Sequence, residues 1–91
     1  MPRFIAVHTI PDYNEENWIE MAKGYAGWIS KFPHGVSYNL TYCGFADSKF
    51  FCEWEAPDKE IIEQLFKEAG LPFDAIYPVK LWNVARMAFE D

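Results

Sequence analysis

Apolar and polar residues alternate on both sides of a short break in the segment Gly35–Ala56. β-Branched and aromatic residues flank the Gly-containing break Gly44–Ser48, a pattern typical of two antiparallel strands joined by a turn. The register that gathers the apolar side chains on one face pairs Tyr42 with Phe50, Leu40 with Cys52, and Tyr38 with Trp54. The other face then collects mostly polar residues: Ser37, Asn39, Thr41, Cys43, Lys49, Phe51, Glu53 and Glu55.

The rest of the chain predicts two further strands and two helices. A strand is expected over Arg3–Ile10, with its β-branched side chains facing the helices. Apolar residues at three- and four-residue steps predict a helix over Glu15–Lys31 and a second over Lys59–Ala69. A last strand is expected over Tyr77–Val84, and the tail Ala85–Asp91 is expected to extend onto a partner or fray.

Helix-end signals and two internal glycines refine these helices. Asn14 is a predicted N-cap, and Gly70 stops the second helix at its C-terminus. Gly24 and Gly27 lie inside the first helix, where close packing on a neighbour is favoured over a hinge.

The element order is βαββαβ, the ferredoxin-like pattern of an α+β fold, and residues 1–91 are expected to form a single domain. Right-handed crossovers predict a four-stranded antiparallel sheet of order 4-1-3-2 with both helices on one face. The residues predicted for the open face are Phe4, His8, Asn39, Thr41, Cys43, Phe51, Glu53 and Trp82. Because several of them are aromatic, we expect a homodimer that covers this face.

Charge and composition exclude several classes of function. Eight basic residues against fourteen acidic ones give a net charge of −6, which argues against nucleic-acid binding. No apolar run approaches the roughly 18–20 residues that span a bilayer, and the N-terminal residues Met1–Ile5 lack the long apolar segment of a signal peptide. We therefore expect a soluble cytoplasmic protein with no membrane partner. Cys43 and Cys52 fall on opposite faces in the predicted register, which predicts free thiols.

A family resemblance begins at Phe51–Asp58, the run FCEWEAPD, which a short helix and the turn Gly70-Leu71-Pro72 follow. This run, together with Gly35-Val36 and Val7-His8, resembles a family of short, largely uncharacterised bacterial and archaeal ferredoxin-like proteins that includes a nickel-binding protein. The resemblance implies a dimeric α+β barrel and a site for nickel or another divalent transition metal. His8 is the residue that matches a family position able to ligate a metal.

Two hypotheses of different class follow. In the first, a homodimeric protein binds a metal ion or a small ligand on its open sheet face, with His8 as metal ligand and with Asn39, Thr41, Phe51 and Trp82 in contact with the ligand. In the second, a cofactor-free enzyme of the oxygenase or isomerase type uses His8 and Glu53 as acid–base groups. Each of these residues also has a purely structural interpretation. His8 is then a hydrogen-bonded structural histidine, Glu53 is a solvated carboxylate, and Phe51 and Trp82 are dimer contacts. Metal content of the purified protein separates the two hypotheses.

Overall fold

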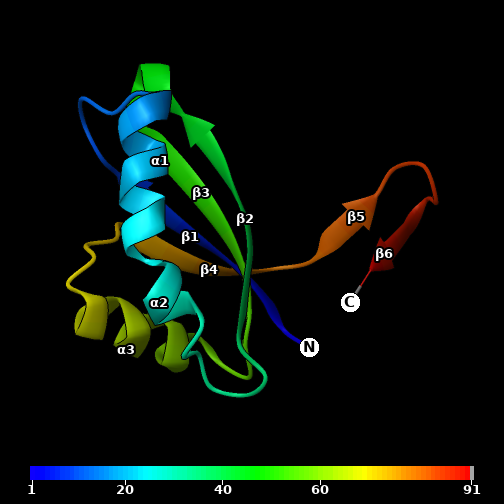
Figure 1. Cartoon of the computed structure of the whole chain (residues 1–91). Coiled ribbons are helices and arrows are strands. Elements are labelled where there is room, and N and C mark those ends of the chain that lie inside the picture. The colour runs from blue at the N-terminus through cyan, green and yellow to red at the C-terminus, as the bar shows by residue number, and fades with distance from the viewer. Residues whose placement is uncertain (91) are drawn as a thin grey trace.

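The computed structural model describes residues 1–90 and shows a four-stranded antiparallel sheet with helices on one of its faces (Figure 1). The strands are β1 (Arg3–Thr9), β2 (Ser37–Gly44), β3 (Lys49–Glu55) and β4 (Ala75–Val79). Their order is β2-β3-β1-β4, which is the predicted order 4-1-3-2 counted from the opposite edge. The predicted α+β class is therefore confirmed.

The first predicted helix is divided in the structure. Helix α1 (Glu15–Gly24) ends at Tyr25, and the short helix α2 (Ala26–Ile29) follows at once. The predicted N-cap is confirmed, because the Asn14 side chain accepts a hydrogen bond from the backbone N–H of Asn17. No helix within residues 1–90 is long and apolar enough to cross a membrane.

The second helix forms over the predicted residues. Helix α3 is Lys59–Ala69, and Asp58 caps it by accepting a hydrogen bond from the backbone N–H of Ile61 at 3.0 Å. Gly70 follows with φ 69°, a conformation that costs glycine little because it has no Cβ. A polar cap and a terminal glycine thus mark both ends of α3 in the sequence.

The core lies between the sheet and the helices, and Trp54 of β3 is at its centre. Its side chain is 1% exposed and contacts the rings of Tyr38, Phe32 and Phe66, with centroids 5.0–5.3 Å apart. The buried members of this core are Phe4, Ala6, Cys52, Trp54, Ala56, Ile62, Phe66 and Ile76. The opposite sheet face has no helix over it, and we call it the open face (Figure 1).

The register of β2 and β3 is correct at one end and shifted by one residue at the other. Tyr38 pairs with Trp54 as predicted, but a bulge between Tyr38 and Leu40 inserts Asn39 as an extra residue. Beyond the bulge the pairs are Leu40 with Glu53, Thr41 with Cys52, Tyr42 with Phe51, and Cys43 with Phe50. Because one extra residue reverses the direction of every later side chain, the predicted open-face placement of Thr41 and Cys43 is wrong.

The predicted direction of the β1 side chains is also wrong. Phe4, Ala6 and His8 are buried on the helix-covered face, and the β-branched residues Ile5 and Val7 lie on the open face. Phe4 pairs with Trp54 and His8 pairs with Phe50, so these side chains of β1 point to the same face as the core side chains of β3.

The end of the chain departs most from prediction. The predicted strand Tyr77–Val84 is divided into β4 and β5 (Leu81–Asn83), and β5 pairs with β6 (Ala88–Glu90) in a separate two-stranded hairpin. This hairpin, which we call the arm, projects away from the sheet (Figure 1). Trp82 therefore belongs to the arm and not to the open face of the sheet. The tail forms β6 where fraying was one expectation, and Asp91 lies outside the described residues.

The two cysteines share the covered face, which corrects the predicted opposite placement. Both are unpaired, and they are diagonal neighbours, because Cys43 lies opposite Phe50 and Cys52 opposite Thr41. Diagonal neighbours in antiparallel strands are about 7–8 Å apart, beyond the usual Cα separation of a disulfide.

We expect both thiols to react slowly with iodoacetamide at neutral pH, Cys43 before Cys52. Burial raises the pKa of both thiols, so the reactive thiolate becomes abundant only above the ordinary range for cysteine. Cys43 is the more accessible of the two. Intact mass against time, with a denatured sample as the control for full reactivity, measures both steps. Modification of Cys52 first would contradict the placement of these side chains.

Candidate functional site

The open face carries an apolar surface, and no helix within residues 1–90 covers it. Tyr42 is 67% exposed, Tyr77 is 55% exposed and Phe51 is 39% exposed. These three come from β2, β4 and β3, so the apolar surface crosses the whole sheet. Its apolar side chains include Ile5, Val7, Leu40, Tyr42, Phe51 and Tyr77.

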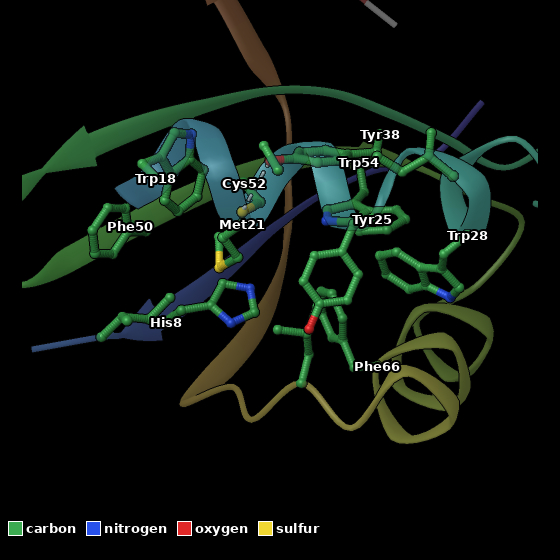
Figure 2. Close-up of a pocket in the computed structure, with 14 residues that line it drawn as sticks. His8, Trp18, Met21, Tyr25, Trp28, Tyr38, Phe50, Cys52, Trp54 and Phe66 are labelled. Atoms are coloured by element: carbon green, nitrogen blue, oxygen red, sulfur yellow. Dashed lines mark hydrogen bonds between the residues drawn. The ribbon is translucent and has the colours of Figure 1, made fainter. Parts of the chain in front are cut away.

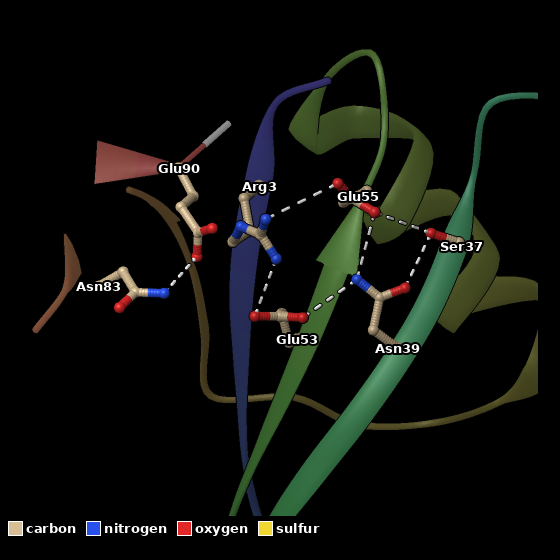
Figure 3. A network of polar contacts seen from close by, with 7 residues as sticks. All are labelled: Arg3, Ser37, Asn39, Glu53, Glu55, Asn83 and Glu90. Atoms are coloured by element: carbon tan, nitrogen blue, oxygen red, sulfur yellow. Dashed lines mark hydrogen bonds and ion pairs between the residues drawn. The ribbon is translucent and has the colours of Figure 1, made fainter. Parts of the chain in front are cut away.

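A network of charged and polar side chains lies at one end of this face (Figure 3). Arg3 Nη1 is 3.0 Å from Glu53 Oε1, and Arg3 Nη2 is 3.9 Å from Glu55 Oε1. The Asn39 amide donates to Glu53 Oε2 at 3.0 Å and to Glu55 Oε2 at 3.3 Å. Ser37 Oγ donates to Asn39 Oδ1 at 3.0 Å. The bulge in β2 places Asn39 in this network, between the two carboxylates.

The network carries more negative than positive charge. One guanidinium faces two carboxylates, and the side chains of Arg3 and Glu53 are 14% and 13% exposed, so solvent screens their interaction only in part. Across the edge of the sheet, Glu90 of the arm lines a groove of about 360 Å³ with Arg3 and Lys80. Figure 3 shows Glu90 beside Asn83, whose amide donates to it at 3.1 Å.

His8 lies on the opposite side of the sheet from this network. Its side chain is buried, with Nδ1 2.8 Å from the carbonyl oxygen of Pro72 and the ring edge-on to Phe66 at 5.0 Å. Thr41 is on the same covered face, where its hydroxyl donates to Cys52 Sγ at 3.2 Å and bonds the Tyr38 hydroxyl. The prediction that His8 and Thr41 share a face with Asn39 and Glu53 is therefore wrong.

Of the predicted site residues, the structure brings three together on the open face: Asn39, Phe51 and Glu53. Arg3, Ser37 and Glu55 complete the network there and were not predicted as site residues. Their signal in the sequence is the pairing register, since Arg3 and Ser37 both lie opposite Glu55.

A cavity of about 70 Å³ lies on the covered face, between α1 and the sheet (Figure 2). His8, Trp54 and Phe66 line it from the sheet and α3, and Met21 and Tyr25 line it from the α1 side. Burial raises the pKa of the Cys52 thiol and of the Tyr38 hydroxyl, so both of these lining groups are neutral at pH 7. The walls are otherwise apolar.

Comparison with known proteins gives a family. The sequence model described as nickel responsive protein SCO4226-like matches residues 4–79, which is most of the chain. The chain belongs to the SCO4226-like family. The family resemblance noted in the sequence is thus confirmed. The matched region contains helices α1, α2 and α3 and the sheet apart from Arg3, but not the arm.

A solved structure shares the fold of this SCO4226-like chain. The crystal structure of SCO4226 from Streptomyces coelicolor A3(2) matches it with a TM-score of 0.70 and 19% sequence identity. The match covers 87% of this chain and 96% of that chain. No curated protein sequence matches. At this identity the likeness establishes the fold alone.

The family description makes metal ligation the first chemistry to test against these residues. Within residues 1–90 there is no group of three or more His, Cys, Asp or Glu side chains placed to hold one metal ion. His8 and Cys52 line the same cavity, but they are only two such groups. The described residues of one copy therefore supply no cluster of three such ligands for a nickel ion.

Proposed function

We propose that this SCO4226-like protein is a homodimer that binds a divalent metal ion, nickel in the first place, between two open sheet faces. The observation that carries the proposal is the charged network of Arg3, Glu53 and Glu55, which lies on the apolar open face of the sheet. The assembly is a ferredoxin-like dimeric α+β barrel, located in the cytoplasm, where the free thiols of Cys43 and Cys52 suit the reducing conditions.

The exposed apolar surface supports the dimer. Contiguous apolar patches of several hundred Å² are rare on monomers and usually mark interfaces. Tyr42, Tyr77 and Phe51 form such a surface on the open face. The arm exposes four further apolar side chains: Trp82, Val84, Met87 and Phe89. The arm projects beyond the sheet (Figure 1), and in the proposed dimer its apolar side chains pack on the partner.

Charge supports a cation as the ligand. Each network contributes one positive and two negative side chains, so it has an excess of one negative charge. Two copies that meet face to face bring four carboxylates and an excess of two negative charges into one interface. Carboxylate oxygens are metal ligands, and one divalent cation neutralises this excess. Glu53 and Glu55 are the ligands in this proposal, while Arg3 and Asn39 orient their carboxylates.

The enzyme alternative has less support. It used His8 and Glu53 together as acid and base, and β1 and β3 direct these side chains to opposite faces of the sheet. Proton transfer between a catalytic pair requires hydrogen-bond reach or one bridging water. A backbone sheet separates these two groups within one chain, and no observation favours a second catalytic pair.

We expect the double substitution Glu53→Gln/Glu55→Gln to weaken nickel binding at least tenfold, about 1.4 kcal/mol. Glutamine keeps the size of the side chain and removes the charge that attracts the cation. Isothermal titration of nickel into each protein measures the effect. Glu20→Gln/Glu68→Gln is the matched control, because both of these glutamates are exposed on helices and far from the open face.

A His8→Ala variant in the same titration separates the two faces. Loss of nickel binding in His8→Ala together with full binding in the double glutamine variant would move the site to the covered face and contradict the proposal. Absence of nickel binding in the unmodified protein would also contradict it. The dimer is tested separately, by the mass of the protein in solution.

A further inference from the structure

The arm has one aromatic side and one polar side. Trp82 lies opposite Phe89 on the aromatic side, where the ring centroids are 4.9 Å apart. These two side chains are 46% and 64% exposed. On the other side, the Asn83 amide donates to Glu90 at 3.1 Å, and the Arg86 guanidinium donates to the same carboxylate at 2.7 Å. The polar contacts therefore hold the shape of the hairpin, while its aromatic side stays exposed.

The arm makes the chain larger than a compact monomer of its length. The radius of gyration is 13.8 Å, whereas about 12 Å is expected for 91 residues. The accessible surface is 6081 Å², whereas a monomer of 10.6 kDa exposes about 5,500 Å². The excess of about 600 Å² approaches the roughly 800 Å² that each partner contributes to a standard interface. Because an isolated two-stranded hairpin is at best marginally stable in water, these dimensions indicate that a second molecule covers the arm.

The position of the arm favours a second copy of this chain as that molecule. The arm projects away from the helices, on the side of the sheet where the open face lies (Figure 1). From Leu81 to the tip at Ala85, five residues reach up to about 16 Å, and packed sheets lie about 10 Å apart. The arm is therefore long enough to cross the gap to a copy seated on the open face and to contact it.

The proposed metal site, on which this inference rests, decides which part of the partner the arm meets. The charged network lies at the end of the sheet where Arg3 pairs with Glu55 and with Val79. In two aligned sheets related by a twofold axis, these ends coincide only when the axis runs along the strands. The strand order of the partner is then reversed, so β4 of one copy lies over β2 of the other. Because the arm follows β4 just after Val79, it meets the beginning of β2 in the partner.

The outer edge of β2 is a surface that such an arm would cover. This strand has eight residues, and within residues 1–90 it pairs only with β3. It contains no lysine or proline, the residues that commonly protect an exposed edge from association. Leu40, which follows the bulge, is 39% exposed. The bulge interrupts the backbone ladder, which favours side-chain packing here over the addition of a further strand.

We propose that the arm of each copy clasps the edge of β2 in the partner. Trp82 and Phe89 pack on the partner's Leu40, and the arm closes over the end of the partner's network that contains Ser37 and Asn39. Twofold symmetry repeats the contact, so the two arms together bury four aromatic rings. The clasp raises the affinity of the dimer and shields the proposed metal site from solvent.

The first test detects the contact between chains directly. Equal amounts of ¹³C-labelled and unlabelled protein are unfolded together and refolded, so that mixed dimers form. Isotope-filtered NOE spectra then report contacts between a labelled and an unlabelled chain. We expect cross-peaks between the Trp82 ring of one chain and the methyl groups of the partner's Leu40, assigned with a Leu40→Ala variant. A dimer without these cross-peaks would overturn the clasp and leave the open-face dimer in place.

A double-mutant cycle measures whether the two side chains form one contact. Trp82→Ala is expected to raise the dimer dissociation constant by about tenfold or more, the effect of losing a buried aromatic contact, and Leu40→Ala by a smaller factor. The double variant is expected to raise it clearly less than the product of the two effects, because the second substitution removes a contact already lost. Trp82→Ala with Tyr77→Ala is the matched control, since Tyr77 lies on β4 at a distance from the arm, and these effects are expected to multiply.

Sedimentation equilibrium measures the dissociation constants and separates the two proposals. Effects of Trp82→Ala and Leu40→Ala that simply multiply, in a protein that remains dimeric, would refute the clasp alone. A mass of 10.6 kDa for the unmodified protein would refute the proposed dimer, and the clasp with it.

Discussion

Trp54→Ala is expected to lower the free energy of unfolding by about 3–5 kcal/mol, the cost typical of removing a large buried aromatic side chain. Trp54 is 1% exposed and contacts rings from β2, α2, α3 and the segment after α2. The substitution leaves a cavity where these elements meet. Since the free energy of unfolding of a native protein is only about 5–15 kcal/mol, the variant loses a large share of its stability. Denaturant unfolding followed by circular dichroism measures the change.

Trp54→Phe is the matched variant for this prediction. It keeps an aromatic ring at the centre of the core and removes the buried indole N–H that lacks a partner in the described residues. We expect it to lose clearly less stability than the alanine variant. A loss below about 1 kcal/mol for Trp54→Ala, the range of an ordinary surface substitution, would show that the core is not organised around this ring.

Helix α3 was predicted residue for residue because its signals are local. Asp58 and Gly70 mark its ends, and its buried stripe includes Ile62 and Phe66. The first helix had the same kind of stripe, but its break at Tyr25 does not follow from periodicity. Gly24 and Gly27 both face open space, so the close packing that was favoured for them is wrong.

Strand faces were harder to predict, because an error of one residue reverses a face. In β2 the bulge at Asn39 reversed Thr41 and Cys43, and no residue type in that run requires a bulge. In β1 both faces are apolar: Phe4 and Ala6 alternate with Ile5 and Val7. Because both faces of β1 are apolar, the sequence does not indicate which of its side chains face the core. Pairing with β3 determines this.

The candidate sites show the same limit. Asn39 and Glu53 met as predicted because the register near the bulge is correct, whereas His8 was assigned to the wrong face with the rest of β1. Trp82 was lost from the sheet because the chain leaves it after Val79 and turns back at Met87, which has φ 51°. The cavity beneath α1 depends on how far a helix stands from the sheet, and this spacing has no sequence signal.

Phe51→Asp is expected to convert the proposed homodimer into a monomer. Phe51 lies on the open face opposite Tyr42, and its strand also carries Glu53 and Glu55 on that face. In the proposed dimer, the substitution replaces a buried ring with a charge on each copy, next to an existing excess of negative charge. Loss of a central aromatic contact typically costs about 2 kcal/mol or more, roughly thirtyfold in the dissociation constant.

Light scattering at micromolar concentrations measures this effect, with a mass of twice 10.6 kDa expected for the unmodified protein and 10.6 kDa for the variant. Ile19→Asp is the matched control, because Ile19 is an exposed apolar residue of α1 on the helix side of the molecule, and it is expected to remain dimeric. Trp82→Asp tests the arm in the same way. If the arm reaches over the partner, this variant dissociates as well, whereas a dimer that Trp82→Asp leaves intact is held by the open face alone. A mass of 10.6 kDa for the unmodified protein would refute the dimer, and with it the metal site that requires two faces.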